Sequence, residues 1–193
     1  MNPLLPLSIQ ENLVLASASP RRRKILSDLD FEFIPAVSSV DEDEVIWEDP
    51  EKRARVLAEL KAVDVQKDFP RKRIIGADTV ISCDGRRLGK PEGREEAFEM
   101  LELLSGRTHE VITALALVSL PCHRVIDAER TTVKFRDLEK REIDRYINTG
   151  ECFDKAGAYG IQGYGAVFVS GIEGCFYNVV GMPVNLMINM LKR

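Results

Sequence analysis

The sequence has few of the residues that soft-metal and nucleophilic chemistry require. It contains only two histidines, His109 and His123, and its four cysteines include no CxxC pair. A zinc site built on Cys and His is therefore not expected, and neither is a catalytic set of the Ser-His-Asp or Cys-His kind. The wide spacing of the cysteines predicts buried, reduced thiols rather than disulfides. These cysteines are Cys83, Cys122, Cys152 and Cys175.

The sequence also lacks an excess of positive charge and a long apolar run. Its formal net charge is −4, which argues against a general nucleic-acid-binding protein. No apolar run approaches the roughly 18 residues of a membrane-spanning helix, and the N-terminus shows no basic and apolar regions of a signal peptide. We therefore expect a soluble, cytoplasmic protein with neither a nucleic-acid nor a membrane partner.

The rest of the composition is that of an ordinary soluble domain. Apolar residues make up 45% and charged residues 30% of the 193 residues. This length fits one domain or two closely packed lobes. We expect residues 1–12 to form a poorly ordered lead-in and residues 13–193 to form a single domain.

Hydrophobic periodicity and capping residues predict alternating strands and helices in the first half and paired strands in the second. Strands are predicted at 13–16, 31–37, 73–82, 109–119 and 125–136, and helices at 20–29, 50–67, 95–104, 139–148 and 183–191. The glycine-rich segment 157–181 suggests hairpins. The order predicts an α/β (mixed α+β) fold with a mixed sheet, in which a cleft between two lobes would be the natural ligand site.

The first segment with chemical potential is SASPRR at 17–22, where a buried strand turns into a helix. Free N–H groups and the positive end of the helix dipole favour an anion there. Arg21 and Arg22 add bidentate donors that match phosphate oxygens. The alternative is a capped helix whose basic first turn is solvated.

The second segment is GADT at 76–79, inside an apolar strand. A buried carboxylate without partners is costly, so Asp78 either marks a strand edge, caps a turn or has a functional partner. Together with Glu42 it could hold a hard cation such as Mg²⁺ through oxygen ligands. Lys90, in LGKP, and Lys61, in the long helix, are weaker signals, because most lysines only solvate a surface.

Two carboxylates, two arginines and two lysines suit phosphoryl-group hydrolysis. Cations neutralise charge that develops on phosphate oxygens, and a carboxylate orients or deprotonates the attacking water. The same set of residues suits acyl transfer poorly.

At these segments the sequence closely resembles the Maf family of house-cleaning nucleotide pyrophosphatases, in the family's own order. The matching pieces are LASASPRRRKIL (15–26), SSVDE (38–42), LAELKA (57–62), IIGADTVI (74–81), LGKP (88–91), LSGRTHEVITALAL (104–117), FDKAGAYGIQGYGA (153–166) and VVGMP (179–183).

The resemblance implies an elongated mixed central sheet flanked by helices, with two lobes and a cleft, similar to inosine triphosphate pyrophosphatase. It also implies a homodimer, Mg²⁺ or Mn²⁺ as cofactor, and hydrolysis of a nucleoside triphosphate between its α- and β-phosphates. By motif, Glu42 and Asp78 would bind metal and activate water, with Asp78 as the proton acceptor. The residues expected to hold the triphosphate are Ser17, Arg21, Arg22, Lys61 and Lys90.

Three positions point to the dTTP/UTP-specific branch of the family. Arg21, Thr79 and Gln162 stand where the branch that resembles 7-methyl-GTP pyrophosphatases carries an aromatic residue, Gln and Glu. The Gln162 amide has a donor and an acceptor, which can match the O4 and N3–H edge of a pyrimidine. The alternatives are a 7-methyl-GTP-type pyrophosphatase and a nucleotide-binding regulator of septum formation or cell division.

Overall fold

The computed structural model describes residues 1–119 and 123–193, which form two compact units. Unit 1 comprises Met1–Asp78, Thr113–Glu129 and Gly181–Arg193, and unit 2 comprises Thr79–Ile112 and Arg130–Val180. The prediction that residues 13–193 form one domain stays a prediction.

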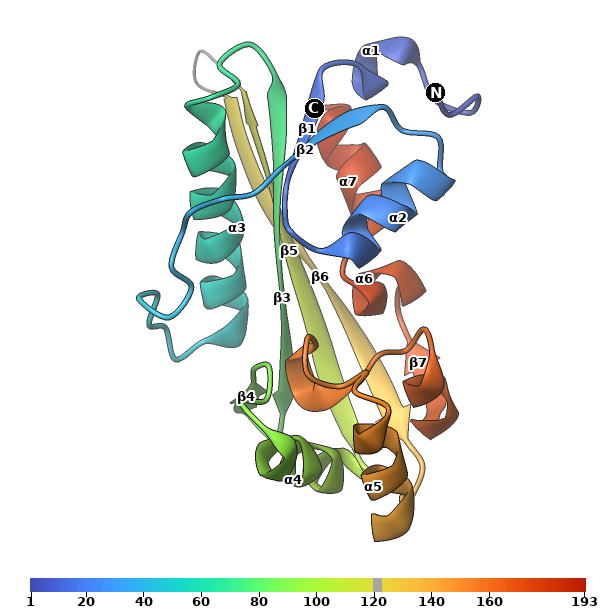
Figure 1. The fold of residues 1–193 in the computed structure, drawn as a ribbon. Helices are drawn as coiled ribbons and strands as arrows, with labels where there is room; N and C mark the ends of the chain where they lie inside the picture. Colours follow the sequence, from blue (N-terminus) through green and yellow to red (C-terminus); the bar gives the residue numbers. More distant parts are fainter. Residues whose placement is uncertain (120–122) are drawn as a thin grey trace. The chain divides into compact units, whose positions relative to one another are not determined.

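The elements agree closely with the predicted ones (Figure 1). The helices are α1 (Leu7–Gln10), α2 (Pro20–Asp28), α3 (Pro50–Gln66), α4 (Arg94–Leu104), α5 (Lys140–Asn148), α6 (Phe176–Val180) and α7 (Val184–Leu191), with short 3₁₀ turns η1 (Ala156–Ala158) and η2 (Tyr164–Phe168). The strands are β1 (Leu13–Ala16), β2 (Phe33–Ala36), β3 (Arg73–Cys83), β4 (Arg86–Leu88), β5 (Thr108–Ser119), β6 (His123–Phe135) and β7 (Val169–Glu173).

Among the described residues the strands form one mixed sheet in the order β2-β1-β3-β5-β6-β7, with β4 paired to β3. β1 runs parallel to β2 and to β3, whereas β4 and β7 run antiparallel to β3 and β6. The predicted mixed α/β fold class is therefore confirmed. The hairpins suggested for residues 157–181 are only partly right, because β7 pairs with β6 while two 3₁₀ turns and α6 occupy the rest.

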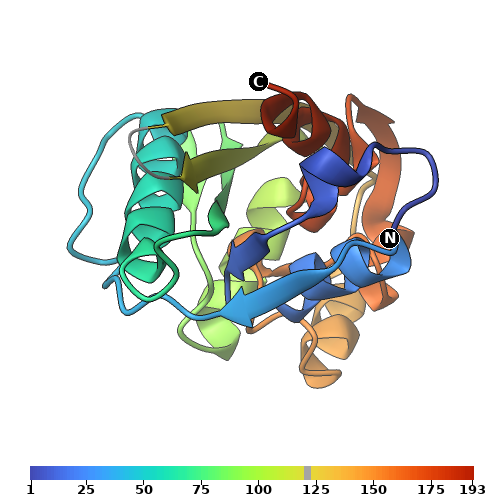
Figure 2. The ribbon, with the colours of Figure 1, turned by 90° about the horizontal axis from the view of Figure 1, so that it is seen from above.

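In unit 1, α3 and α7 pack on opposite faces of β3 (Figures 1 and 2). Successive side chains of a strand point to opposite faces. Ile75 faces α7, where it lines a small apolar pocket with Met187 and Met190. Gly76, the next residue, faces the backbone of α3.

The predicted buried face of α3 is wrong, because the buried residues are displaced by about one position along the helix from the predicted ones. We expect Val56, Leu57, Leu60 and Val63 to face the core, but Leu60 is 40% exposed and Ala54, Ala58 and Ala62 are fully buried. Hydrophobicity alone favours the leucine, whereas the close approach of α3 to β3 requires small side chains. The buried face also carries Arg53 and Lys61.

The lead-in is more structured than predicted. Residues 7–10 form α1, and Gln10 is fully buried. The Gln10 side-chain amide donates to the carbonyl oxygens of Leu5 and Asn2 at 2.7 and 3.0 Å, and its oxygen accepts from the Asn2 N–H at 2.7 Å. The side chain of Gln10 thus holds the N-terminal residues against α1, a role that the composition does not reveal.

In unit 2 an aromatic cluster surrounds a buried histidine. His109 is 2% exposed, and its ring lies edge-on to Phe135 and Tyr159 at centroid distances of 5.1 and 5.4 Å. His109 Nε2 lies 2.8 Å from the Tyr159 hydroxyl, and Nδ1 has no protein partner among the described residues. Burial lowers the pKa of His109 from 6.5 to about 4.

The depressed pKa of His109 predicts a loss of stability in mild acid. The unfolded chain takes up a proton near pH 6.5 and the folded chain only near pH 4, so stability present above pH 6.5 falls as pH drops between these values. The loss should be on the order of 3 kcal/mol. Urea denaturation at a series of pH values would measure it.

The matched comparison uses both histidines. His109→Phe should remove this part of the slope of stability against pH, whereas substitution of the exposed His123 by Gln should leave the slope unchanged. An unaltered slope in His109→Phe would contradict the assignment to His109.

The cysteines are free among the described residues, as predicted, but not all are buried. Cys83 and Cys152 are buried and Cys175 is half-buried, while Cys122 lies outside the described residues. Burial, and to a smaller extent Asp84, raises the pKa of the Cys83 thiol, which keeps it protonated and weakly nucleophilic at neutral pH. In the described part of the chain, no helix is long and apolar enough to cross a membrane.

Candidate active site

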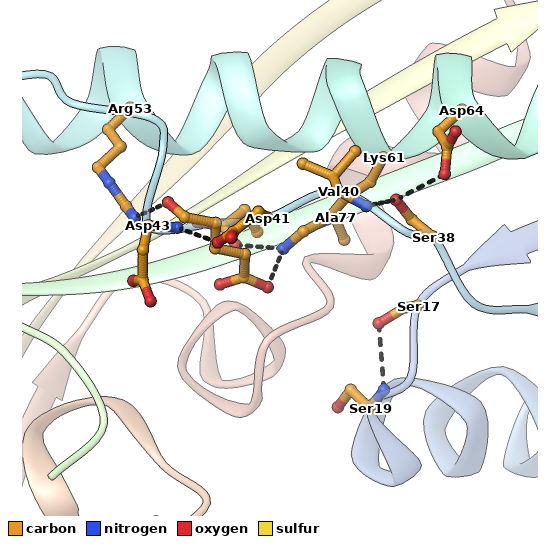
Figure 3. A network of polar contacts seen from close by, with 12 residues as sticks. Ser17, Ser19, Ser38, Val40, Asp41, Asp43, Arg53, Lys61, Asp64 and Ala77 are labelled. Atoms are coloured by element: carbon orange, nitrogen blue, oxygen red, sulfur yellow. Dashed lines mark hydrogen bonds and ion pairs between the residues drawn. The ribbon is translucent and has the colours of Figure 1, made fainter. Parts of the chain in front are cut away.

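The turn from β1 into α2 is built around two serines. Ser19 caps α2 and accepts a hydrogen bond from the Arg22 N–H, and Pro20 occupies the first helical position, as predicted. The Ser17 hydroxyl oxygen accepts from the Ser19 N–H at 3.2 Å (Figure 3) and from Arg22 Nη1 at 2.9 Å. Because two donors already occupy this oxygen, its hydroxyl hydrogen is suited to donate to an acceptor such as a phosphate oxygen.

Arg22 is a buried arginine that joins three segments of unit 1. Its Nε donates to the Gly181 carbonyl at 2.8 Å, and its Nη1 donates to the Ala77 carbonyl at 3.0 Å as well as to Ser17. Burial lowers the pKa of its guanidinium, and the nearby Asp78 acts in the opposite direction. Arg22 therefore fixes Ser17 against β3 and brings positive charge beside Asp78.

Lys61 brings the two predicted catalytic carboxylates together. Its Nζ lies 2.7 Å from Asp78 Oδ1 and 2.8 Å from Glu42 Oε1. Lys61 and Asp78 are 8% and 6% exposed, while the Glu42 side chain is 45% exposed. The residues come from α3, β3 and the segment between β2 and α3, so the fold assembles in unit 1 a group that is dispersed in the sequence.

The protonation of Asp78 reflects this environment. Burial raises the pKa of Asp78, Lys61 and Arg22 lower it, and Glu42 raises it. A carboxylate with a raised pKa is a stronger proton acceptor than an exposed aspartate, which suits a general base.

Gly76 explains how Lys61 reaches Asp78. A methyl carbon at Gly76 would lie 2.0 Å from the Ala58 carbonyl oxygen and 2.9 Å from Ala62 Cβ. Only glycine allows this approach of α3 to β3, and Lys61 and Asp78 each lie within three residues of the contact.

We expect Gly76→Ala to destabilise the fold by about 1–3 kcal/mol, because backbone must shift to admit the methyl group. It should also reduce activity by displacing Lys61. Urea denaturation measures the first effect. Gly171→Ala is the matched control, since its added carbon meets nothing nearer than Lys134 Cβ at 4.0 Å; equal stabilities of the two variants would contradict the packing argument.

The donor set fits a hard divalent cation that is shared with substrate. Asp78 and Glu42 offer carboxylate oxygens around one position, now spanned by the Lys61 ammonium. Mg²⁺ is commonly held by one or two carboxylates and completed by water and substrate phosphates. No group of three or more His, Cys, Asp or Glu side chains suited to a metal occurs within the described residues, so a cation here would take its other ligands from substrate and water.

The remaining predicted site residues are placed as follows. Arg21 is half-buried in the first turn of α2 in unit 1. Thr79 directly follows Asp78 in β3 and is half-buried, whereas Lys90 and Gln162 are exposed, and all three belong to unit 2. Their parts in binding stay predictions.

Sequence reasoning missed two side chains of α3 that contact the segment carrying Glu42. Arg53 is 7% exposed and donates to the carbonyl oxygens of Glu42 and Val45. Asp64 accepts from the backbone and hydroxyl of Ser39. Arg53 lies in the charged stretch EKRAR, where nothing in the pattern distinguishes a buried arginine from a solvated one.

The family model described as Maf-like protein matches residues 12–193. The chain belongs to the Maf family.

Two relatives named for their substrates align with nearly the whole Maf chain. It is 47% identical over 183 residues to the dTTP/UTP pyrophosphatase of Pyrococcus furiosus, covering 94% of this chain and 95% of that one. It is 47% identical over 184 residues to the dTTP/UTP pyrophosphatase of Clostridium kluyveri, covering 93% and 96%. The family predicted from the eight sequence segments is confirmed, and these relatives bear the name of the predicted branch.

A solved structure shares the fold at low sequence identity. The Staphylococcus aureus Ham1 protein superposes with a TM-score of 0.52 at 12% identity, covering 93% of this chain and 97% of that one. This likeness supports the predicted fold class of the Maf chain.

Proposed function

We propose that this Maf protein is a nucleoside triphosphate pyrophosphatase that hydrolyses dTTP and UTP to the monophosphate and pyrophosphate. The observation that carries the proposal is the buried Lys61 ammonium in contact with both Asp78 and Glu42, in the same unit as the N-terminus of α2. The names of relatives at 45–47% identity support the substrate assignment.

Each candidate site residue of unit 1 has a defined part in the proposed reaction. The Ser17 hydroxyl, Arg21 and the N-terminus of α2 hold phosphate oxygens, and Arg22 positions Ser17 and adds positive charge. Asp78 accepts a proton from the attacking water. The water oxygen bonds to one phosphorus of the α–β anhydride as the bond from that phosphorus to the bridging oxygen breaks, which gives the monophosphate and pyrophosphate. Lys61 orients Asp78 and Glu42 and offsets negative charge that develops on the phosphates.

A divalent cation, Mg²⁺ or Mn²⁺, would be held by Glu42 and Asp78. When bound, it would polarise phosphate oxygens and neutralise part of the substrate's charge. In unit 2, Lys90 is proposed to contact the triphosphate, and Thr79 and Gln162 to contribute to base selection. A homodimer and a cytoplasmic location complete the proposal.

One assay tests reaction and specificity together. Purified protein is incubated with Mg²⁺ or Mn²⁺ and with dTTP, UTP, CTP, GTP or 7-methyl-GTP, and monophosphate, pyrophosphate and free phosphate are quantified separately. We expect pyrophosphate chiefly from dTTP and UTP. Turnover of 7-methyl-GTP instead would overturn the specificity, and nucleotide binding without turnover would favour the regulator of septum formation.

A further inference from the structure

The segment 37–49 between β2 and α3 carries Glu42 but contains no helix or strand. Its side chains are largely exposed, including Ile46 at 87% and Trp47 at 50%. A connection of this kind is expected to be mobile unless specific contacts hold it. A carboxylate that must meet Lys61 and a substrate therefore needs an anchor.

We propose that Arg53 is a positioning residue for the reaction, which holds Glu42 in place by fixing the backbone of the segment that carries it. The inference rests on the proposed function, in which Glu42 belongs to the catalytic set. Arg53 does not touch substrate in this proposal and acts only through Glu42.

Among the described residues, the Arg53 guanidinium donates its hydrogen bonds to backbone carbonyl groups and not to side chains. Its Nη2 donates to the Glu42 carbonyl oxygen at 2.6 Å and its Nε donates to the Val45 carbonyl oxygen at 2.9 Å. The Val45 N–H also points to the Glu42 carbonyl at 3.4 Å. The guanidinium thus holds residues 42–45 in a turn and fixes the backbone of Glu42 relative to α3.

The burial of Arg53 supports a specific role. A helix-surface arginine in the stretch EKRAR would ordinarily remain solvated, since removing a guanidinium from water is costly. Arg53 is nonetheless 7% exposed, and its charge-assisted hydrogen bonds offset that cost. A methionine of similar length could fill the space but could not hold two carbonyl groups.

Asp64 provides a second anchor near the start of the segment. Its Oδ2 accepts from the Ser39 N–H at 2.8 Å and from the Ser39 hydroxyl at 2.9 Å. The Ser38 hydroxyl donates to the same oxygen at 3.3 Å (Figure 3). Arg53, Lys61 and Asp64 lie within about 80° of one another around α3, given 3.6 residues per turn. One face of α3 therefore holds the segment at two places, Ser39 and residues 42–45, and also contacts the Glu42 carboxylate.

The decisive test is a double-mutant cycle on dTTP hydrolysis with Arg53→Met, Glu42→Gln and the double variant. We expect Arg53→Met to lower kcat/KM by about 10- to 100-fold, because displacement by about 1 Å has effects of this size. In the Glu42→Gln background the same change should lower kcat/KM by less than about 2-fold, since residues that act as a unit are not additive. Arg55→Met, a half-buried arginine on the same helix that pairs with Glu51 and Asp127, is the matched control.

Trp47, the single tryptophan of the chain, gives a readout that is independent of turnover. It lies two residues beyond Val45, so acrylamide quenching of its fluorescence should increase in Arg53→Met and stay unchanged in Arg55→Met. Arg53→Lys keeps the positive charge but lacks the planar array of N–H donors of a guanidinium. Its kcat/KM and its fluorescence quenching should therefore lie between those of wild type and Arg53→Met. It also serves if Arg53→Met does not fold.

The outcomes separate the two proposals. An inactive wild-type protein would refute the proposed function, and Trp47 quenching would still decide whether Arg53 anchors the segment. An active wild type in which the Arg53 and Glu42 effects multiply in full, or in which Arg53→Met retains normal kcat/KM and quenching, would overturn the positioning role.

Discussion

Asp78→Asn is expected to lower the turnover of dTTP by about 10²- to 10⁴-fold, the usual contribution of a positioned general base. Asparagine retains the shape and a hydrogen-bond acceptor, but it neither takes the proton of the attacking water nor offers a charged oxygen to a cation. Folding should be retained, because the substitution removes a buried carboxylate while Lys61 keeps its contact with Glu42. The measurement is kcat with dTTP and Mg²⁺, together with a thermal denaturation curve.

The matched control for Asp78 is Asp28→Asn. Asp28 is an exposed aspartate at the end of α2 that pairs with Lys24 across one helical turn. Its substitution should leave kcat unchanged. Near-normal turnover by folded Asp78→Asn would refute the role of Asp78 as proton acceptor.

Lys61→Met is expected to destabilise the protein by about 3–5 kcal/mol at neutral pH, the typical cost of breaking a buried ion pair. Without the Nζ contacts, Asp78 is a buried carboxylate that faces Glu42. Lys61 lowers the pKa of Asp78 in the wild type, so its removal raises that pKa further.

The sign of the pH dependence follows from this shift. A carboxyl group whose folded pKa is raised contributes stability below its unfolded pKa, about 3.9, and loses it as pH rises through the folded pKa. The deficit of Lys61→Met relative to wild type should therefore be larger at pH 8 than at pH 5. Urea denaturation at both pH values measures it.

Lys24→Met provides the comparison for this variant, since Lys24 forms an exposed pair of the kind that contributes little. A deficit of Lys61→Met that is the same at pH 5 and pH 8 would show that Asp78 does not respond to Lys61. A deficit no larger than that of Lys24→Met would show that the buried pair is not stabilising.

Much of the fold is predictable because its signals are local. Ser19 and Pro20 define the start of α2 in both sequence and structure, and the apolar run at 13–16 is β1 in full. The packing of α3 is not local in this sense. Its buried face is set by the contact of Ala58 and Ala62 with Gly76, which is separated from them by a loop and part of a strand.

The candidate site shows the same division. Asp78 stands out in the sequence because a carboxylate is unusual in an apolar strand and needs a partner when it is buried. In the structure this partner is Lys61. Lys61 and Glu42 are weaker signals in the sequence, and the family resemblance is what assigns them to substrate and metal binding. Arg53 has neither a local sequence signal nor a place in the motifs of the family. Its two hydrogen-bond acceptors are backbone carbonyl groups, which every residue type carries, so the sequence does not reveal them.

The way in which Arg53 holds residues 42–45 bears on how this protein can evolve. Every amino acid has a backbone carbonyl group, so the hydrogen bonds to Glu42 and Val45 survive most changes of side chain in the segment. Exposed positions such as Ile46 and Trp47 are thereby released from catalytic constraint. The segment can diverge between lineages, or accept an engineered label, while the carboxylate beside it keeps its place.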